Sequence, residues 1–324
     1  MNHFLEKAAI LLFRHRSRAL VGTQHGGWRL CSFLGSGSYG ASFRAESAEG
    51  AHAVLKLVRK PQSKQSARSF LAWMDAQERE RTPSRPCPGS AARAHPPAED
   101  RQDACDARAH DRRAEAGTLP PRADVWTECA ALQRCEGSPL IPRWLGIVNE
   151  GGRYFIVLDH LAGESLQSLL GSRKRFTEQE IAIVAHDVTA ALAHAHARGV
   201  AHNDLRPANV LFDGRRAALI DFGLATFFPP EQGKADFPDS SANDRSGLAD
   251  VLLYLLYTRY DGPRTKRSWR EELNLSRCQQ DLLEALFADR PPFGGWSEVQ
   301  RAVERAFPLA PHGTMPLTRD APTG

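Results

Sequence analysis

The chain has 324 residues, of which 42% are hydrophobic and 25% are charged, as in an average soluble globular protein. Its formal net charge is only +4, which excludes a nucleic-acid footprint spread over the whole chain. No apolar run reaches the roughly 18–20 residues of a membrane span, and no secretory signal is recognisable, so we expect a cytoplasmic protein. The six cysteines lack any CxxC pair, which favours reduced thiols over a zinc site or a disulfide framework.

Residues 1–26 form an N-terminal extension in which an apolar run, 8–13, precedes a basic run, 14–18. This pattern predicts a short amphipathic helix with a cationic end. Because a single apolar stripe is what any docked helix shows, we favour packing over the next domain. Contact with a membrane surface is the alternative.

Residues 27–74 read as three strands followed by the start of a helix, and a glycine-rich turn joins the first two strands. This turn, the glycine loop (residues 34–40), has the pattern G-x-G-x-x-G. Glycines there let backbone N–H groups approach phosphate oxygens closely. A dinucleotide fold uses the same spacing but needs a helix directly after the third glycine, and residues 41–45 and 51–58 predict strands instead.

Residues 80–124, approximately, predict a disordered insertion. Between Arg81 and Ala123, 8 Arg, 10 Ala and 7 Pro fill 25 of the 43 positions, and no residue is aromatic. Such a stretch cannot bury enough apolar area to offset the entropy of ordering it. Because its acidic residues are interspersed with the arginines, we do not expect it to bind nucleic acid.

Folded character returns over residues 125–308. In chain order, the predicted elements are a helix from about 125, two β-rich runs within 141–161 around a turn at 149–152, a helix over 177–198, a hairpin of strands 210–212 and 217–220, and a buried helix over 248–257. The long helix has well-defined ends, with Thr177 as N-cap, Glu180 completing a capping box and Gly199 as the stop. We expect a flexible tail over residues 309–324.

Lys56 lies within an apolar strand, with four apolar neighbours in the run 53–57. A lysine in such a strand is costly unless it meets an anion, which argues against an ordinary surface lysine. The partner that we expect is Glu128, which shares a helix face with Leu132. This ion pair would hold the ammonium group at the phosphates.

The strongest signal is the polar loop (residues 202–209, HNDLRPAN), which is followed by the sequence DFG at 221–223. Two carboxylates, a guanidinium and a carboxamide fall within twenty residues. They belong to Asp204, Asp221, Arg206 and Asn209. This set suits metal-assisted phosphoryl transfer, which needs oxygen ligands for Mg²⁺, a carboxylate near the attacking hydroxyl and a cation for the γ-phosphate.

Together these motifs resemble those of the eukaryotic-like serine/threonine protein kinases, particularly the small bacterial ones. The resemblance covers roughly residues 30–258 without the insertion, with the motifs in the order and spacing of that family. It implies an α+β, bilobal protein-kinase-like fold, with a β-rich N-lobe over 27–160 and a mainly helical, compact C-lobe over 161–308. It also implies an enzyme that uses ATP and Mg²⁺ to phosphorylate Ser/Thr hydroxyls of a protein substrate.

The resemblance also assigns roles to individual residues. The ATP-binding set that it implies is Leu34, Gly35, Ser36, Gly37, Ser38, Gly40, Lys56, Glu128, Asp159 and Leu161, the last two through their backbone. The catalytic set is Asp204, Lys56 and Arg206, and the metal-binding set is Asn209 and Asp221. Leu132, His202 and Phe222 match an apolar spine that links the lobes, and Asp244 matches an aspartate that braces the polar loop from a buried helix.

Several positions depart from the family pattern. Asn203 stands where an arginine usually reads a phosphate, so we expect activity that such a phosphate does not gate. Arg206 replaces a lysine, which keeps the charge but changes its geometry. Ser42 replaces an apolar residue that packs on adenine. Only twenty residues separate Gly223 from Asp244, without an Ala-Pro-Glu motif, which leaves a smaller hydroxyl compound open as the acceptor.

Three alternatives remain. A small-molecule kinase of related fold, of the aminoglycoside or choline type, usually has a less regular glycine loop than this chain. A pseudokinase acting as a binding module would normally lack Lys56 or one of the polar residues at 204, 209 and 221. A metal site of histidines is disfavoured because His194 and His196, two apart on a helix, point in different directions.

Overall fold

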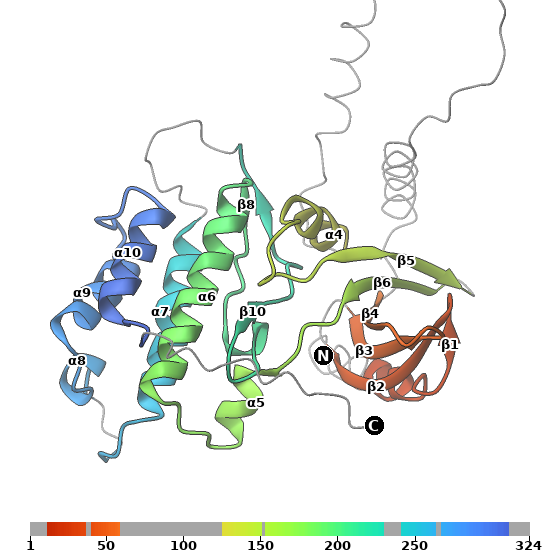
Figure 1. The fold of residues 1–324 in the computed structure, drawn as a ribbon, viewed down its shortest axis with the longest axis horizontal. Helices are drawn as coiled ribbons and strands as arrows, with labels where there is room; N and C mark the ends of the chain where they lie inside the picture. Colours follow the sequence, from red (N-terminus) through yellow and green to blue (C-terminus); the bar gives the residue numbers. More distant parts are fainter. Residues whose placement is uncertain are drawn as a thin grey trace, which may run out of the picture.

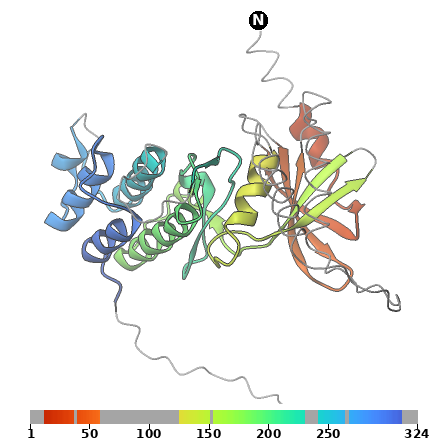
Figure 2. The ribbon, with the colours of Figure 1, turned by 90° about the horizontal axis from the view of Figure 1, so that it is seen from above.

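The computed structural model describes residues 12–36, 40–58, 125–150, 153–229, 241–263 and 267–310. The predicted insertion, a helix expected before it, most of the C-terminal tail and the tip of the glycine loop at 37–39 lie outside the described residues. The molecule has two lobes, with a curled sheet at one end and a group of helices at the other (Figures 1 and 2). This is the α+β, bilobal architecture that the sequence predicts.

The N-lobe is a six-stranded antiparallel sheet with the strand order β1-β2-β3-β4-β6-β5. Its strands are β1 (Gln24–His25), β2 (Trp28–Ser36), β3 (Gly40–Ser47), β4 (His52–Val58), β5 (Trp144–Glu150) and β6 (Arg153–Asp159). The β2–β3 hairpin carries the glycine loop, as predicted. A Cβ atom at Gly40 would overlap the carbonyl oxygen of Leu57 in β4, so this close strand pairing requires glycine.

The two faces of this sheet pack differently. Alternate residues of β3 and β4, such as Phe43, Leu55 and Leu57, form an apolar cluster with Phe155 of β6. Residues 12–18 are helical, and Phe13 packs against the same cluster, as expected for a docked helix. Because side chains alternate along a strand, Lys56 points to the opposite face, toward the other lobe.

Helix α4 (Val125–Arg134) lies between the sheet and the helical lobe (Figure 2). The remaining elements are β7 (Glu164–Ser165), α5 (Leu166–Gly171), α6 (Glu178–His196), β8 (Val200–Ala201), η1 (Pro207–Asn209), β9 (Val210–Phe212), β10 (Ala217–Leu219), β11 (Thr226–Phe227), α7 (Ala242–Tyr257), α8 (Trp269–Glu272), α9 (Arg277–Phe287) and α10 (Trp296–Ala306). Among the described residues, no helix is long and apolar enough to cross a membrane.

Helix α6 has the ends that the sequence predicts. The Thr177 hydroxyl accepts from the Glu180 backbone N–H at 3.2 Å, and the Glu180 carboxylate accepts from the Thr177 backbone N–H at 2.9 Å. Such a cap contributes about 1 kcal/mol. Gly199 follows the helix with φ of 69°, a conformation that glycine adopts without strain.

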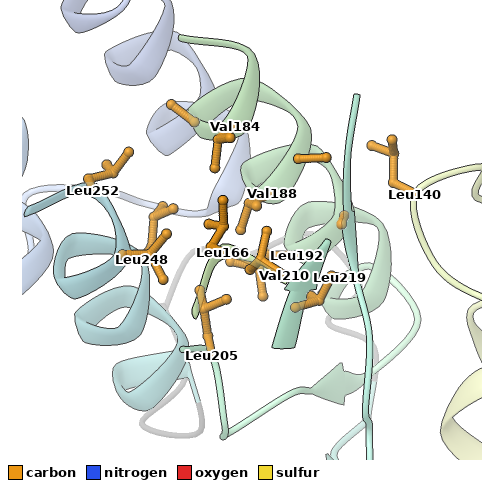
Figure 3. Close-up of a cluster of buried hydrophobic side chains, with 14 of the residues drawn as sticks. Leu140, Leu166, Val184, Val188, Leu192, Leu205, Val210, Leu219, Leu248 and Leu252 are labelled. Atoms are coloured by element: carbon orange, nitrogen blue, oxygen red, sulfur yellow. The ribbon is translucent and has the colours of Figure 1, made fainter. Parts of the chain in front are cut away.

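The C-lobe core surrounds α6, and Leu205 joins it from the polar loop. Figure 3 shows Leu205 beside Leu248 of α7 and Leu166 of α5, with Val210 of β9 close by. Burying a leucine side chain contributes about 2 kcal/mol. The polar loop is therefore anchored to the core by one of its own residues.

Helix α7 begins at Ala242, six residues before the apolar run that predicted it. Four of the six extra residues are polar, and two of these four, Asp244 and Arg245, are buried. Their burial follows from contacts with other segments, which local hydrophobicity does not report. The four cysteines in the described part of the chain are free thiols, as expected from their spacing.

Candidate active site

Lys56 joins the two lobes. Its Nζ atom lies 2.6 Å from Oε2 of Glu128 on α4 and 2.8 Å from Oδ1 of Asp221 in the segment after β10. Lys56 and Glu128 are buried, whereas 41% of the Asp221 side chain is exposed. The predicted pairing of Lys56 with Glu128 is present, and the carboxylate of Asp221 completes a three-residue cluster, the interlobe cluster.

The charges of the interlobe cluster shift one another's protonation. Burial favours a lower pKa for Lys56, but the negative charges of Glu128 and Asp221 outweigh burial and raise it. Burial favours a higher pKa for Asp221, but the positive charge of Lys56 lowers it overall. Lys56 and Asp221 are thus held ionised, as an electrostatic role requires.

Within the polar loop, Asp204, Arg206 and Asn209 lie together. Nδ2 of Asn209 donates to Oδ2 and to the backbone carbonyl of Asp204, both at 2.8 Å. Nε of Arg206 lies 3.7 Å from Oδ2 of Asp204, and both side chains are partly exposed. The two bonds from Asn209 hold the carboxylate and the backbone of Asp204 in place.

Asp244 on α7 supports the polar loop from below. Its Oδ2 accepts from the backbone N–H of His202 at 2.8 Å, and its Oδ1 accepts from the backbone N–H of Asn203 at 2.6 Å. Nε2 of His196 lies 2.7 Å from the same carboxylate. Asp244 is fully buried, with partners on both oxygens, which matches the bracing role that the resemblance implies.

Gly247, one turn further along α7, is a supporting residue that sequence reasoning missed. A Cβ atom at this position would lie 2.6 Å from the backbone carbonyl oxygen of Leu205. The glycine therefore lets α7 pass directly against the polar loop. A glycine inside an apolar helix is the signal that could have identified it.

The glycine loop is described only in part. Leu34, Gly35 and Ser36 end β2 and Gly40 begins β3, whereas Gly37 and Ser38 lie outside the described residues. A Cβ atom at Gly35 would meet nothing within 4 Å, so close packing does not require glycine at this position, in contrast to Gly40.

Asp159 ends β6, and its carboxylate accepts from the backbone N–H and Nε of Arg143. Leu161 lies two residues further, in the connection to β7. Both residues therefore lie where the chain passes from the sheet to the helical lobe, a connection that we call the hinge. Their side chains do not take part in the interlobe cluster.

The apolar spine is visible in part. The rings of His202 and Phe222 meet edge to face with centroids 4.7 Å apart, and Nε2 of His202 lies 3.0 Å from the carbonyl oxygen of Ile220. Both residues and Leu132 are buried. The ring contact connects the polar loop to the DFG segment.

The histidines of α6 contact other parts of the fold. Nε2 of His194 lies 2.9 Å from the carbonyl oxygen of Cys135, whereas His196 contacts Asp244. Among the described residues, no group of three or more His, Cys, Asp or Glu is arranged as a metal site. A metal ion bound by the described residues would therefore need further ligands that these side chains do not supply.

Asp221 and Asn209 have oxygen atoms that could supply part of the ligand set of a Mg²⁺ ion. Oxygen ligands are what Mg²⁺ prefers, and it commonly takes one or two protein oxygens together with substrate phosphates and water. Asp221 is partly exposed, with only Oδ1 on Lys56, and Asn209 uses its amide nitrogen toward Asp204, which leaves its oxygen as a potential ligand. These residues fit the metal that the resemblance implies.

Comparison with known protein families identifies the same region. A family model described as "Protein kinase domain" matches residues 106–243. This range contains Glu128, the polar loop and the DFG segment. It begins after Lys56 and the glycine loop, whose assignment rests on their sequence pattern and on the contacts of Lys56.

Individual relatives agree with the family match. The probable serine/threonine-protein kinase YbdM of Bacillus subtilis (strain 168) is 29% identical over 171 residues, which are 52% of this chain and 66% of the relative. The MAP kinase-interacting serine/threonine-protein kinase 1 of Xenopus tropicalis is 34% identical over 109 residues, 32% of this chain and 26% of the relative. The chain thus spans just under two thirds of the first relative's length and about a quarter of the second's.

Proposed function

We propose that this chain is a member of the eukaryotic-like serine/threonine protein kinases, which the family match over residues 106–243 and the similarity to YbdM support, and that it transfers the γ-phosphate of ATP to a Ser or Thr hydroxyl of a protein substrate. The observation that carries the proposal is the interlobe cluster, in which Lys56 contacts Glu128 and Asp221 at 2.6 and 2.8 Å. The ring contact of His202 with Phe222 joins the polar loop, which carries Asp204, to the DFG segment, which carries Asp221. The proposed contacts for metal and acceptor therefore lie on connected segments.

In this proposal, each polar side chain has a separate task. The partly exposed Asp204 carboxylate orients the acceptor hydroxyl and takes its proton. Lys56 binds the α- and β-phosphates, and Arg206 stabilises charge on the transferring group. The hinge residues Asp159 and Leu161 offer backbone groups to adenine.

The cofactors belong to the proposal too. Asn209 and Asp221 would hold Mg²⁺, and when bound this ion would neutralise and orient the phosphate oxygens. The glycine loop would cover the phosphates with its backbone N–H groups. The proposal also includes the division of the chain into an N-lobe at 27–160 and a C-lobe at 161–308. It includes a cytoplasmic location, where ATP is supplied.

The test is the intact mass of the full chain after incubation with Mg-ATP, together with transfer to a panel of Ser/Thr peptides. Wild type, Asp204→Asn and Asp281→Asn are compared side by side, because Asp281 is an exposed aspartate on α9 and serves as the matched control. We expect that wild type and Asp281→Asn transfer phosphate to the chain itself or to a peptide, and that Asp204→Asn transfers none. Equal phosphate with Asp204→Asn would refute the assignment of Asp204.

The same experiment separates the alternatives. If neither chain nor peptide gains phosphate but Mg-ATP still raises the Tm, small hydroxyl compounds become the acceptors to screen. If Mg-ATP leaves the Tm unchanged as well, the chain is a binding module and the proposal fails.

A further inference from the structure

Asn203, in the middle of the polar loop, makes side-chain contacts that sequence reasoning did not anticipate. Its Nδ2 donates to the backbone carbonyl of Leu224 at 3.3 Å and to Oγ1 of Thr226 at 2.8 Å, and its Oδ1 accepts from Nδ2 of Asn243 at 3.4 Å. A carbonyl oxygen can only accept, so the amide nitrogen must face Leu224. One neutral side chain thus ties the polar loop both to the segment after DFG and to the start of α7.

The backbone of Asn203 is also unusual, with φ of 63°. Asparagine tolerates this left-handed conformation better than most residues with a side chain. The backbone N–H of Asn203 donates to Asp244 in the same conformation. Asn203 is therefore fitted to this position by both its backbone and its amide.

The segment that Asn203 ties down reaches the other lobe through β11. Thr226 and Phe227 pair with β8, and the guanidinium of Arg134, the last residue of α4, lies 4.4 Å from the Phe227 ring centroid. Arg134 follows Glu128 on α4 by less than two turns. The next residue, Cys135, contacts His194 of α6 through its carbonyl oxygen.

These contacts form one continuous path. It runs from the polar loop through Asn203 to β11, from Phe227 to Arg134, and along α4 to Glu128 and Lys56. Every connection from Asn203 to Phe227 uses a neutral donor, a carbonyl, a hydroxyl or a ring.

We propose that Asn203 is a positioning residue which, through β11 and Arg134, holds α4 where Glu128 meets Lys56. The consequence for phosphoryl transfer rests on the proposed function. The consequence for the position of α4 does not, because it concerns contacts within the folded chain. The two can therefore fail separately.

The test compares four variants of the full chain. Asn203→Gly keeps the left-handed backbone accessible and removes the amide, whereas Asn203→Asp keeps the shape but sets a carboxylate against the Leu224 carbonyl. Thr226→Val removes one acceptor at nearly constant volume. Asn274→Asp makes the same chemical change at an exposed position between α8 and α9 and is the control.

Two readouts are taken on each protein after phosphatase treatment. The first is the rate of ADP formation or phosphate transfer from Mg-ATP. The second is hydrogen exchange of the backbone amides in α4, β11 and, as an internal reference, α9 and α10. The second readout needs no activity.

We expect both Asn203 variants to lose about tenfold or more in rate, the effect of two lost hydrogen bonds and an unpaired carbonyl. Exchange should accelerate in β11 and α4 and stay at the wild-type level in α9 and α10. Thr226→Val should show a smaller change in the same places. The control should match wild type.

Two results would overturn the inference. The first is that the Asn203 variants stay within about twofold of the control in rate and in exchange. The second is acceleration of exchange that extends uniformly over α9 and α10. If wild type shows no phosphate transfer at all, the proposed function fails, and exchange in α4 alone decides whether Asn203 positions that helix.

Discussion

Asp221 and Asp244 illustrate how differently this chain uses the same side chain. Asp244 lies within the C-lobe and is fully buried. Its carboxylate accepts hydrogen bonds from two backbone N–H groups and also contacts His196. Asp221 lies between the lobes, contacts Lys56 through Oδ1 and leaves 41% of its side chain exposed. The first carboxylate is saturated by the protein, whereas the second retains capacity for a ligand.

This difference separates support from chemistry. A saturated buried carboxylate holds its neighbours in place, and its removal leaves their donors unpaired. An unsaturated carboxylate beside a cation can accept a further partner without unfolding anything. We therefore expect stability to depend mainly on Asp244, and ligand binding and turnover to depend mainly on the interlobe cluster.

The largest expected effect on stability is that of Asp244→Ala. It leaves the N–H groups of His202 and Asn203 unpaired in the core, which costs about 3–5 kcal/mol and lowers the Tm on the order of 10 °C. Calorimetry and urea midpoints measure the change. Asp250→Ala, on an exposed position of the same helix, should stay within about 0.5 kcal/mol, and equal losses from both variants would remove the distinction.

Lys56→Met tests whether turnover depends on the interlobe cluster. It should lower turnover of Mg-ATP by about 100- to 1000-fold, the cost of removing one positioned electrostatic group, while far-UV circular dichroism stays that of the wild type. Lys174→Met is the matched control, because Lys174 pairs with Glu180 far from the interlobe cluster. Turnover that survives in Lys56→Met would disprove the role assigned to this lysine.

The pairing of Lys56 with Glu128 could be predicted from sequence because each residue carried a strong local signal, a lysine inside an apolar strand and a glutamate on an apolar helix face. The capping box of α6 was predictable for the same reason, since both partners lie within four residues. The contribution of Asp221 to the same cluster came from the family resemblance as a metal ligand, and its contact with Lys56 was not foreseen.

Other contacts had no local signal. The hydrogen bonds of Asn203 depend on where Leu224 and Thr226 lie in space, and the stacking of Arg134 on Phe227 joins residues more than ninety positions apart. The start of α7 was missed because its first turn is polar, and Asp244 is buried there by the polar loop rather than by hydrophobicity. Such through-space contacts require coordinates.

Gly247→Ala tests the contact between α7 and the polar loop more gently. The added methyl group must displace the Leu205 carbonyl, which we expect to cost about 1–3 kcal/mol and to lower turnover by shifting Asp204. Gly171→Ala, where a Cβ would meet nothing within 4 Å, is the control and should leave both Tm and turnover unchanged or slightly raise the Tm. A wild-type Tm for Gly247→Ala would show that the loop can move freely.

The smallest expected effect is a pH dependence. Lys56 lowers the folded-state pKa of Asp221 below its ordinary value of 3.8, although burial opposes this. The stability that this ion pair contributes is therefore present above pH 3.8 and is lost as the pH falls through the lower folded pKa. The difference in Tm between wild type and Asp221→Asn should be constant from about pH 7 to 5 and shrink below pH 4; a difference that grows on acidification would contradict this sign.

The central claim is that the interlobe cluster binds nucleotide together with Mg²⁺, and calorimetric titration with a non-hydrolysable ATP analogue tests it most directly. For wild type and Asp244→Asn, we expect Mg²⁺ to tighten binding of the analogue by about tenfold or more, equivalent to 1.4 kcal/mol. For Asp221→Asn, we expect binding without Mg²⁺ to persist and the tightening to disappear. An equal effect of Mg²⁺ on wild type and Asp221→Asn, or no binding of the analogue to wild type, would contradict the account.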